Sequence, residues 1–76
     1  MEIKLLVATC INSKLFEKRV LEVVEAKGIY ADIEKIDYLP DAIKYGVIYT
    51  PALVVNGKVV SSGKVLSTEE ISRLIH

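Results

Sequence analysis

The sequence has very little cysteine, histidine or tryptophan. Its 76 residues include one cysteine, one histidine and no tryptophan. A single cysteine excludes an internal disulfide framework and any zinc site built from several cysteines. The one histidine, His76, adds little to a metal site by itself. We therefore expect no metal and no other cofactor.

An excess of one charge and long hydrophobic runs are also missing. Ten basic residues balance ten acidic ones, so the basic surface typical of a nucleic-acid binder is not expected. No apolar run approaches the roughly 20 residues of a membrane span. The start, MEIKLLVA, is too short and too acidic for a signal peptide. With 51% hydrophobic residues the chain can build a core, and we expect a single domain over residues 1–76 in a reducing cytoplasm, without nucleic-acid or membrane partners.

The hydrophobic pattern predicts alternating strands and helices in the first half of the chain. Residues 3–8 form a short apolar run typical of a buried strand. Residues 12–27 carry apolar side chains at helical spacing and end with lysine before a glycine, which is a helix stop. Residues 29–36 alternate as an edge strand does. Residues 40–46 begin with proline and end with glycine, which predicts a short helix.

The second half of the sequence predicts a hairpin and a last helix. Residues 52–55 and 58–61 are strand-like runs around an Asn-Gly pair, which favours a type I′ turn. The sequence STEE at 67–70 is a capping box, so the last helix is expected from about Thr68 to the end of the chain. Together the segments predict an α/β fold with a four-stranded mixed sheet flanked by helices, its first two strands parallel.

The order βαβαββα, combined with two motifs, resembles a minimal thioredoxin fold. Cys10 follows the first strand, and Thr50-Pro51 precedes the hairpin. The segments CINSKL at 10–15 and YGVIYTPALVVNGKVVSSGKV at 45–65 are similar to the small redox-active disulfide proteins of the thioredoxin/glutaredoxin-like family. The resemblance covers essentially the whole chain. It implies a thiol–disulfide oxidoreductase whose partners are protein disulfide substrates and a thiol reductant or disulfide reductase.

The sequence departs from the family at its second motif cysteine. The family pattern is Cys-x-x-Cys, and this chain has Cys10-Ile11-Asn12-Ser13. The resemblance makes Cys10 the nucleophile, and a helix N-terminus stabilises the thiolate that attacks a disulfide. Ser13 occupies the place of the resolving cysteine, where it can donate a hydrogen bond but cannot form a disulfide. Ser13 is either the native residue of a monothiol protein or a replacement of a cysteine, and the sequence leaves both open.

The resemblance also implies a substrate-binding loop at residues 49–51. In the thioredoxin fold the proline corresponding to Pro51 is cis and faces the first cysteine. Thr50 would then pair with an extended substrate strand beside Cys10. Tyr49 would border the same site.

Two functional classes remain open for Cys10. It is a redox nucleophile, or it is an idle small hydrophobic residue in a non-catalytic binding module of the same fold. The rate of alkylation and its dependence on pH distinguish the two classes. Because Cys10 has no internal partner, oxidation is expected to link two copies of the chain through it.

Overall fold

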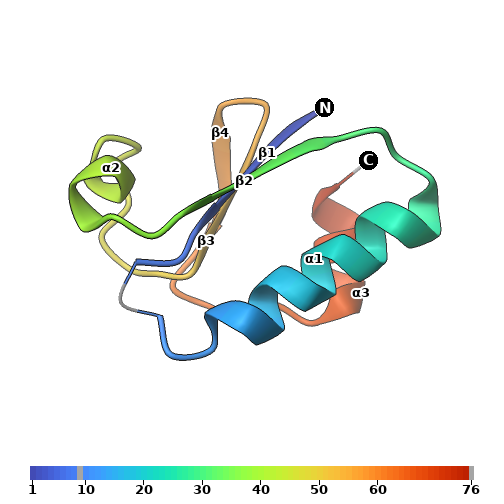
Figure 1. The fold of residues 1–76 in the computed structure, drawn as a ribbon, viewed down its shortest axis with the longest axis horizontal. Helices are drawn as coiled ribbons and strands as arrows, with labels where there is room; N and C mark the ends of the chain where they lie inside the picture. The colour runs from blue at the N-terminus through green and yellow to red at the C-terminus, as the bar shows by residue number, and fades with distance from the viewer. Residues whose placement is uncertain (9, 76) are drawn as a thin grey trace.

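The computed structural model describes residues 1–8 and 10–75, which form strands and helices in the order predicted. These elements are β1 (Glu2–Leu6), α1 (Ser13–Lys27), β2 (Asp32–Ile36), α2 (Leu39–Ile43), β3 (Ala52–Val55), β4 (Lys58–Ser62) and α3 (Thr68–Leu74) (Figure 1). The predicted α/β fold with βαβαββα order is confirmed. None of the described helices is long and apolar enough to span a bilayer.

The strands form one mixed sheet in the order β2-β1-β3-β4. β1 pairs in parallel with β2 and antiparallel with β3, and β3 and β4 form an antiparallel hairpin. The hairpin turn has positive φ at both residues, 49° at Asn56 and 83° at Gly57, as a type I′ turn requires. The mixed sheet, the parallel first pair and the edge position of β2 are confirmed.

The tip of the hairpin is tied to the start of β1 by two hydrogen bonds. The backbone N–H of Asn56 donates to the carbonyl of Glu2 at 2.7 Å. In return, the N–H of Glu2 donates to the side-chain Oδ1 of Asn56 at 2.8 Å. Asparagine therefore both tolerates the turn backbone and joins the hairpin to the central strand.

Several element boundaries differ from the sequence prediction. β1 covers residues 2–6 rather than 3–8, β2 begins at Asp32 rather than at residue 29, and α2 covers residues 39–43 rather than 40–46. Smaller shifts place the start of α1 at Ser13 rather than at residue 12, and the end of β4 at Ser62 rather than at residue 61. α3 ends at Leu74 rather than at the end of the chain, where His76 lies outside the described residues. Gly46 has a left-handed φ of 78°, and its N–H donates to the carbonyl of Ile43 at 2.8 Å. The glycine thus closes a turn that follows the helix.

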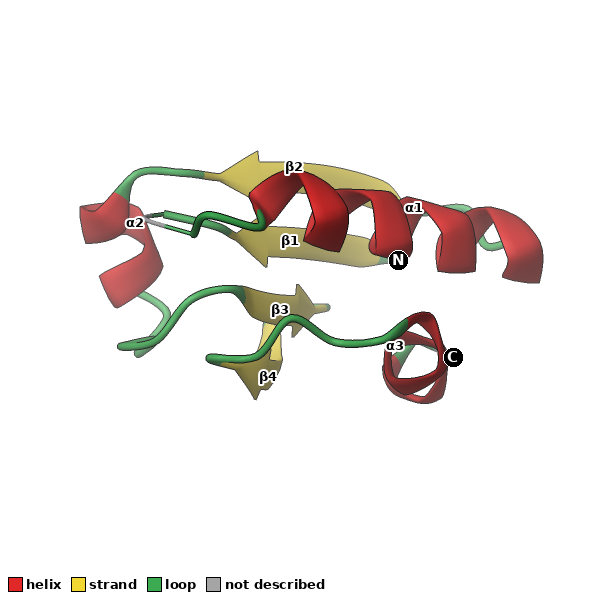
Figure 2. Cartoon of the chain, turned by 90° about the horizontal axis from the view of Figure 1, so that it is seen from below, coloured by secondary structure: helices red, strands yellow, loops and turns green. Residues whose placement is uncertain are grey.

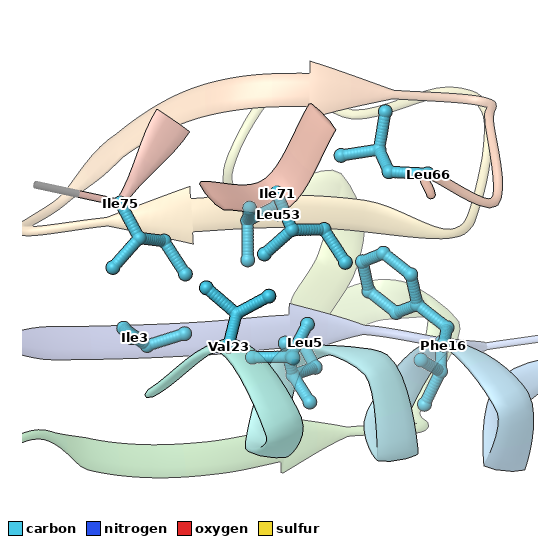
Figure 3. Packing of buried hydrophobic residues seen from close by; sticks show 10 residues of the cluster. Ile3, Leu5, Phe16, Val23, Leu53, Leu66, Ile71 and Ile75 are labelled. Carbon is cyan, nitrogen blue, oxygen red and sulfur yellow. The ribbon is translucent and has the colours of Figure 1, made fainter. Parts of the chain in front are cut away.

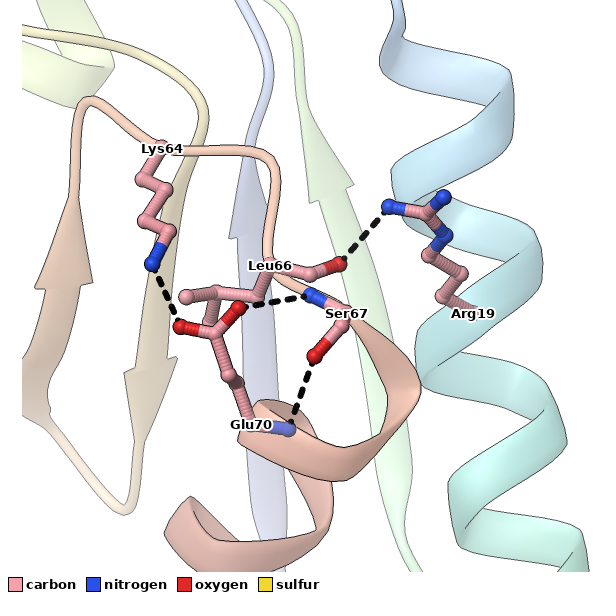
Figure 4. A network of polar contacts seen from close by, with 5 residues as sticks. All are labelled: Arg19, Lys64, Leu66, Ser67 and Glu70. Atoms are coloured by element: carbon pink, nitrogen blue, oxygen red, sulfur yellow. Dashed lines mark hydrogen bonds and ion pairs between the residues drawn. The ribbon is translucent and has the colours of Figure 1, made fainter.

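The start of α3 is fixed by the predicted capping box (Figure 4). The hydroxyl of Ser67 accepts from the N–H of Glu70, and the Glu70 carboxylate accepts from the N–H of Ser67, each at 3.2 Å. Lys64 pairs with that carboxylate at 2.5 Å. The Lys64 hydrogen bond, followed by those of Ser67, lowers the pKa of Glu70. Nearby, Arg19 of α1 donates to the carbonyl of Leu66 at 3.0 Å, which joins this turn to α1.

α1 and α3 cover one face of the sheet and pack beside each other (Figures 1 and 2). The core beneath them consists of buried aliphatic side chains and one phenylalanine, shown in part in Figure 3: Ile3, Leu5, Val7, Phe16, Val20, Val23, Leu53, Leu66, Ile71 and Ile75. Burial of each large apolar side chain contributes about 1.5–3 kcal/mol. Phe16, in the first turns of α1, is fully buried, so it holds the N-terminal part of α1 against the sheet.

The opposite face carries a smaller core under α2, which lies toward one end of the sheet (Figure 1). Its buried residues are Leu6, Ala42, Val47, Ala52 and Val54. The carboxyl end of β1 is therefore packed on both faces. This packing fixes the position of the strand end that precedes Cys10.

Candidate functional site

Cys10 lies in the segment that joins β1 to α1. Its N–H donates to the carbonyl of Val7 at 3.0 Å, and the N–H of Val7 donates to the carbonyl of Ile36 at 2.8 Å. The cysteine side chain is half-buried and packs against the core beneath α1. α1 begins three positions later, at Ser13. The thiol thus belongs to the N-terminal approach of a 15-residue helix, where unpaired N–H groups and the helix dipole favour an anion.

Ser13 is the first residue of α1 and is half-buried. Asn12 precedes it at the N-cap position, yet the Asn12 side chain makes no capping hydrogen bond to the helix. An N-cap side chain commonly satisfies an N–H of the first turn. The Asn12 side chain therefore leaves the N–H groups of the first turn of α1 without a side-chain cap from this position.

The loop at Thr50-Pro51 is bound to the Cys10 segment. The hydroxyl of Thr50 donates to the carbonyl of Ala8 at 2.6 Å, although the two residues are 42 positions apart. Ala8 is only 1% exposed and lies two residues before Cys10. The Thr50–Pro51 peptide bond is cis, and Pro51 is buried. The structure therefore brings the predicted loop and the predicted nucleophile's segment together.

The same loop is anchored on its other side by the end of β4. The hydroxyl of Ser62 donates to the carbonyl of Tyr49 at 3.0 Å, and the N–H of Gly63 donates to the carbonyl of Pro51 at 2.9 Å. Gly63 has a φ of +78°, and a Cβ there would lie 2.9 Å from the Cβ of Tyr49. Only glycine fits this position without displacing Tyr49.

Sequence reasoning missed the roles of Ala8, Ser62 and Gly63. Ala8 takes part only through its backbone carbonyl. Every residue type has this group, so the sequence carries no signal for the role. Ser62 and Gly63 carry a weak signal, because a Ser-Gly pair after a strand is typical of a turn. That signal predicts a turn, but it does not predict that the turn bonds to the loop at residues 49–51.

Apolar side chains are exposed around the candidate site. Ile11, directly after Cys10, is 98% exposed, and Ile48 and Tyr49 are 81% and 70% exposed. Ile48 also lines a shallow groove of about 460 Å³ with four further residues of the α2 region, Leu39, Ile43, Gly46 and Val47. Ile48 and Tyr49 are adjacent in the chain and lead into Thr50, so this loop presents exposed apolar surface of the kind that contacts other molecules.

One other surface feature does not include the predicted site residues. A hollow of about 540 Å³ lies between α1 and α3 and has Glu22, Lys27, Glu69 and Arg73 in its lining. Among residues 1–8 and 10–75, no three histidine, cysteine, aspartate or glutamate side chains form a group that could hold a metal ion.

Comparison with known proteins gives matches along essentially the whole chain. A family model described as thioredoxin domain matches residues 1–76. A protein named thioredoxin, from Methanothermobacter thermautotrophicus, is 33% identical over 75 residues, which cover 99% of this chain and 97% of the relative.

Proposed function

Because the chain belongs to the thioredoxin family over its whole length, we propose that it carries out thiol–disulfide exchange with Cys10 as the nucleophile. Proteins of this family generally act on protein disulfides. The observation that supports the proposal best is the joining of the Cys10 segment to the Thr50-Pro51 loop through the Thr50–Ala8 hydrogen bond. The contact supports the proposal because Ala8 lies two residues before Cys10, and because Thr50 follows Tyr49, which is 70% exposed.

The proposed reaction begins with attack of the Cys10 thiolate on one sulfur of a substrate disulfide. A sulfur–sulfur bond forms between Cys10 and the substrate, the substrate disulfide breaks, and the departing thiolate takes a proton from solvent. Ser13 supplies a hydroxyl donor near the thiolate at the start of α1. It cannot attack the mixed disulfide, because an alcohol forms no disulfide.

Release of the substrate therefore needs a separate thiol reductant. One thiol attacks the Cys10 sulfur and frees the substrate as a thiol, and a second thiol then frees Cys10. The two reductant thiols end as a disulfide, so electrons pass from them to the substrate. A reducing cytoplasm supplies such thiols.

The proposed substrate is an extended polypeptide segment that contains a disulfide. Residues 49–51 border the Cys10 segment, and Tyr49 presents its ring to solvent. Ile11 and Ile48 add exposed aliphatic side chains, which match the apolar residues of a polypeptide better than a small charged disulfide. The loop at 49–51 would lie along the substrate backbone.

Mass spectrometry of the intact protein tests the proposal. The reduced chain is incubated with hydroxyethyl disulfide or with insulin, and the reaction is quenched by acid. We expect a single mixed disulfide on the unchanged chain and none on Cys10→Ser. A folded chain whose Cys10 stays unmodified, and which is alkylated only slowly, would instead support a binding module with an idle cysteine.

A further inference from the structure

We infer that Thr50 is a positioning residue for Cys10, acting through the backbone turn that carries the thiol. The inference rests on the proposed role of Cys10 as nucleophile. Its starting point is the 2.6 Å hydrogen bond from the Thr50 hydroxyl to the carbonyl of Ala8. The side chain of Thr50 thus has a role separate from the proposed pairing of its backbone with substrate.

The carbonyl of Ala8 belongs to the turn that leads directly into Cys10. This turn is closed by the hydrogen bond from the Cys10 N–H to the carbonyl of Val7 at 3.0 Å. Ala8 is 1% exposed, so water cannot easily replace the threonine hydroxyl as a donor. A buried carbonyl that loses its donor is unfavourable. Without the hydroxyl, the turn is expected to move until that carbonyl finds another partner.

The donor itself is held in place from the far side. Ser62 binds the carbonyl of Tyr49, and the N–H of Gly63 binds the carbonyl of Pro51, at 3.0 and 2.9 Å. Both neighbours of Thr50 are therefore fixed to the end of β4. A donor on a fixed loop defines a position for the acceptor, whereas a donor on a loose loop would follow the acceptor wherever it moved.

The chain of contacts thus runs from β4 through the loop at 49–51 to the Cys10 turn. Disulfide exchange requires the attacking sulfur to approach along the axis of the substrate disulfide, and small misplacements of a reacting group slow such steps strongly. Loss of the Thr50 hydroxyl should slow attack by Cys10 roughly tenfold while the protein remains folded. A threonine that only stabilised the fold would change the melting temperature and leave the rate of the folded protein unchanged.

The test compares Thr50→Val, which keeps the shape and removes the donor, with Thr50→Ser, which keeps the hydroxyl. Ser67→Ala is the matched control, because it also deletes a hydroxyl hydrogen bond, at 3.2 Å, at the start of α3 and outside the proposed site. Each reduced variant is mixed with insulin or hydroxyethyl disulfide, and mixed-disulfide formation is followed by quenched-flow mass spectrometry. Thermal melts followed by circular dichroism are used to choose one assay temperature at which every variant is fully folded.

We expect Thr50→Val to react roughly tenfold more slowly than the unchanged chain, with Thr50→Ser and Ser67→Ala within about twofold of it. Equal rates for Thr50→Val and the unchanged chain would overturn the positioning role and leave the proposed function intact. Equal slowing by Ser67→Ala would overturn it as well, since the effect would then follow stability. If Thr50→Val does not fold, Thr50→Ala takes its place under the same criteria. An unreactive unchanged chain would defeat the proposed function, and the positioning role with it.

Discussion

Replacing Ser13 with cysteine should turn the site into one that closes an internal disulfide. Ser13 opens α1 and follows Cys10 by three positions. Residues at that spacing around a helix start lie on the same side, so their Cα atoms should fall within the bridgeable range of about 4.4–6.8 Å. The introduced thiol can then attack a mixed disulfide at Cys10 from within the same molecule.

The expected gain in turnover rate follows from the rigidity of the chain on both sides of the segment from Cys10 to Ser13. The Cys10 N–H is bonded to Val7 at 3.0 Å, and the first turn of α1 is closed by the bond from the Phe16 N–H to the Asn12 carbonyl, also at 3.0 Å. Little chain entropy is left to lose when so short a loop closes. Because the unchanged chain needs an external thiol at this step, Ser13→Cys should turn over at least about tenfold faster, which corresponds to about 1.4 kcal/mol in the barrier.

Insulin reduction, followed by turbidity with a dithiol reductant, measures this difference. Ser13→Ala is the matched control, because it removes the serine hydroxyl without adding a thiol, and it should not exceed the unchanged chain. Cys10→Ser in the Ser13→Cys background should be inactive if Cys10 makes the first attack. Peptide mapping of the oxidised Ser13→Cys chain should find the internal disulfide.

One result would refute the reasoning outright. If oxidised Ser13→Cys keeps two free thiols and reduces insulin no faster than the unchanged chain, the two positions do not face each other at the start of α1. The assignment of Cys10 as the nucleophile of a thioredoxin-type site would then be wrong.

Three further predictions concern association, backbone strain and pH. Air oxidation of the unchanged chain should give a dimer linked through Cys10, visible on non-reducing electrophoresis and absent from Cys10→Ser. Gly63→Ala should destabilise the protein by about 1–2 kcal/mol, because its φ is left-handed and the new Cβ meets Tyr49 at 2.9 Å; an unchanged urea midpoint would contradict this. Glu70→Gln should lower the melting temperature at neutral pH, where the carboxylate pairs with Lys64. Because the pKa of Glu70 is lowered in the folded chain, its contribution is complete above the ordinary value of 4.5 and is lost as the pH falls through the lowered one. Thermal melts of both chains should therefore converge in acid.

Much of the fold could be predicted because the decisive signals act over short stretches of chain. The Asn-Gly pair sets the backbone of the hairpin turn by its tolerance of positive φ. The STEE sequence makes its two capping bonds within one helical turn. Gly28, with a φ of 63°, ends α1 by accepting the left-handed conformation that other residues avoid.

The site could be predicted only in part, because its contacts join distant segments. The resemblance named Cys10, Ser13, Tyr49, Thr50 and Pro51, and their chemical roles remain predictions. The bond from Thr50 to Ala8 ends on a backbone carbonyl, and carbonyls are the same in every residue. Likewise, a glycine after a strand predicts a turn, while the approach of that glycine to a tyrosine is visible only in three dimensions.

The paired bonds between Asn56 and Glu2 couple the opening of the hairpin turn to the opening of β1. At that end, β1 cannot separate from the hairpin unless both bonds break. At the other end of β1, the bonds from the Val7 N–H to Ile36 and from the Thr50 hydroxyl to Ala8 hold the chain before Cys10. Since central strands exchange their amide protons only through large openings, hydrogen exchange should be slow in β1 and β3 and faster at the exposed residues Ile11 and Asn12. A bulky substrate would therefore meet a closed sheet whose two ends open only when several bonds break.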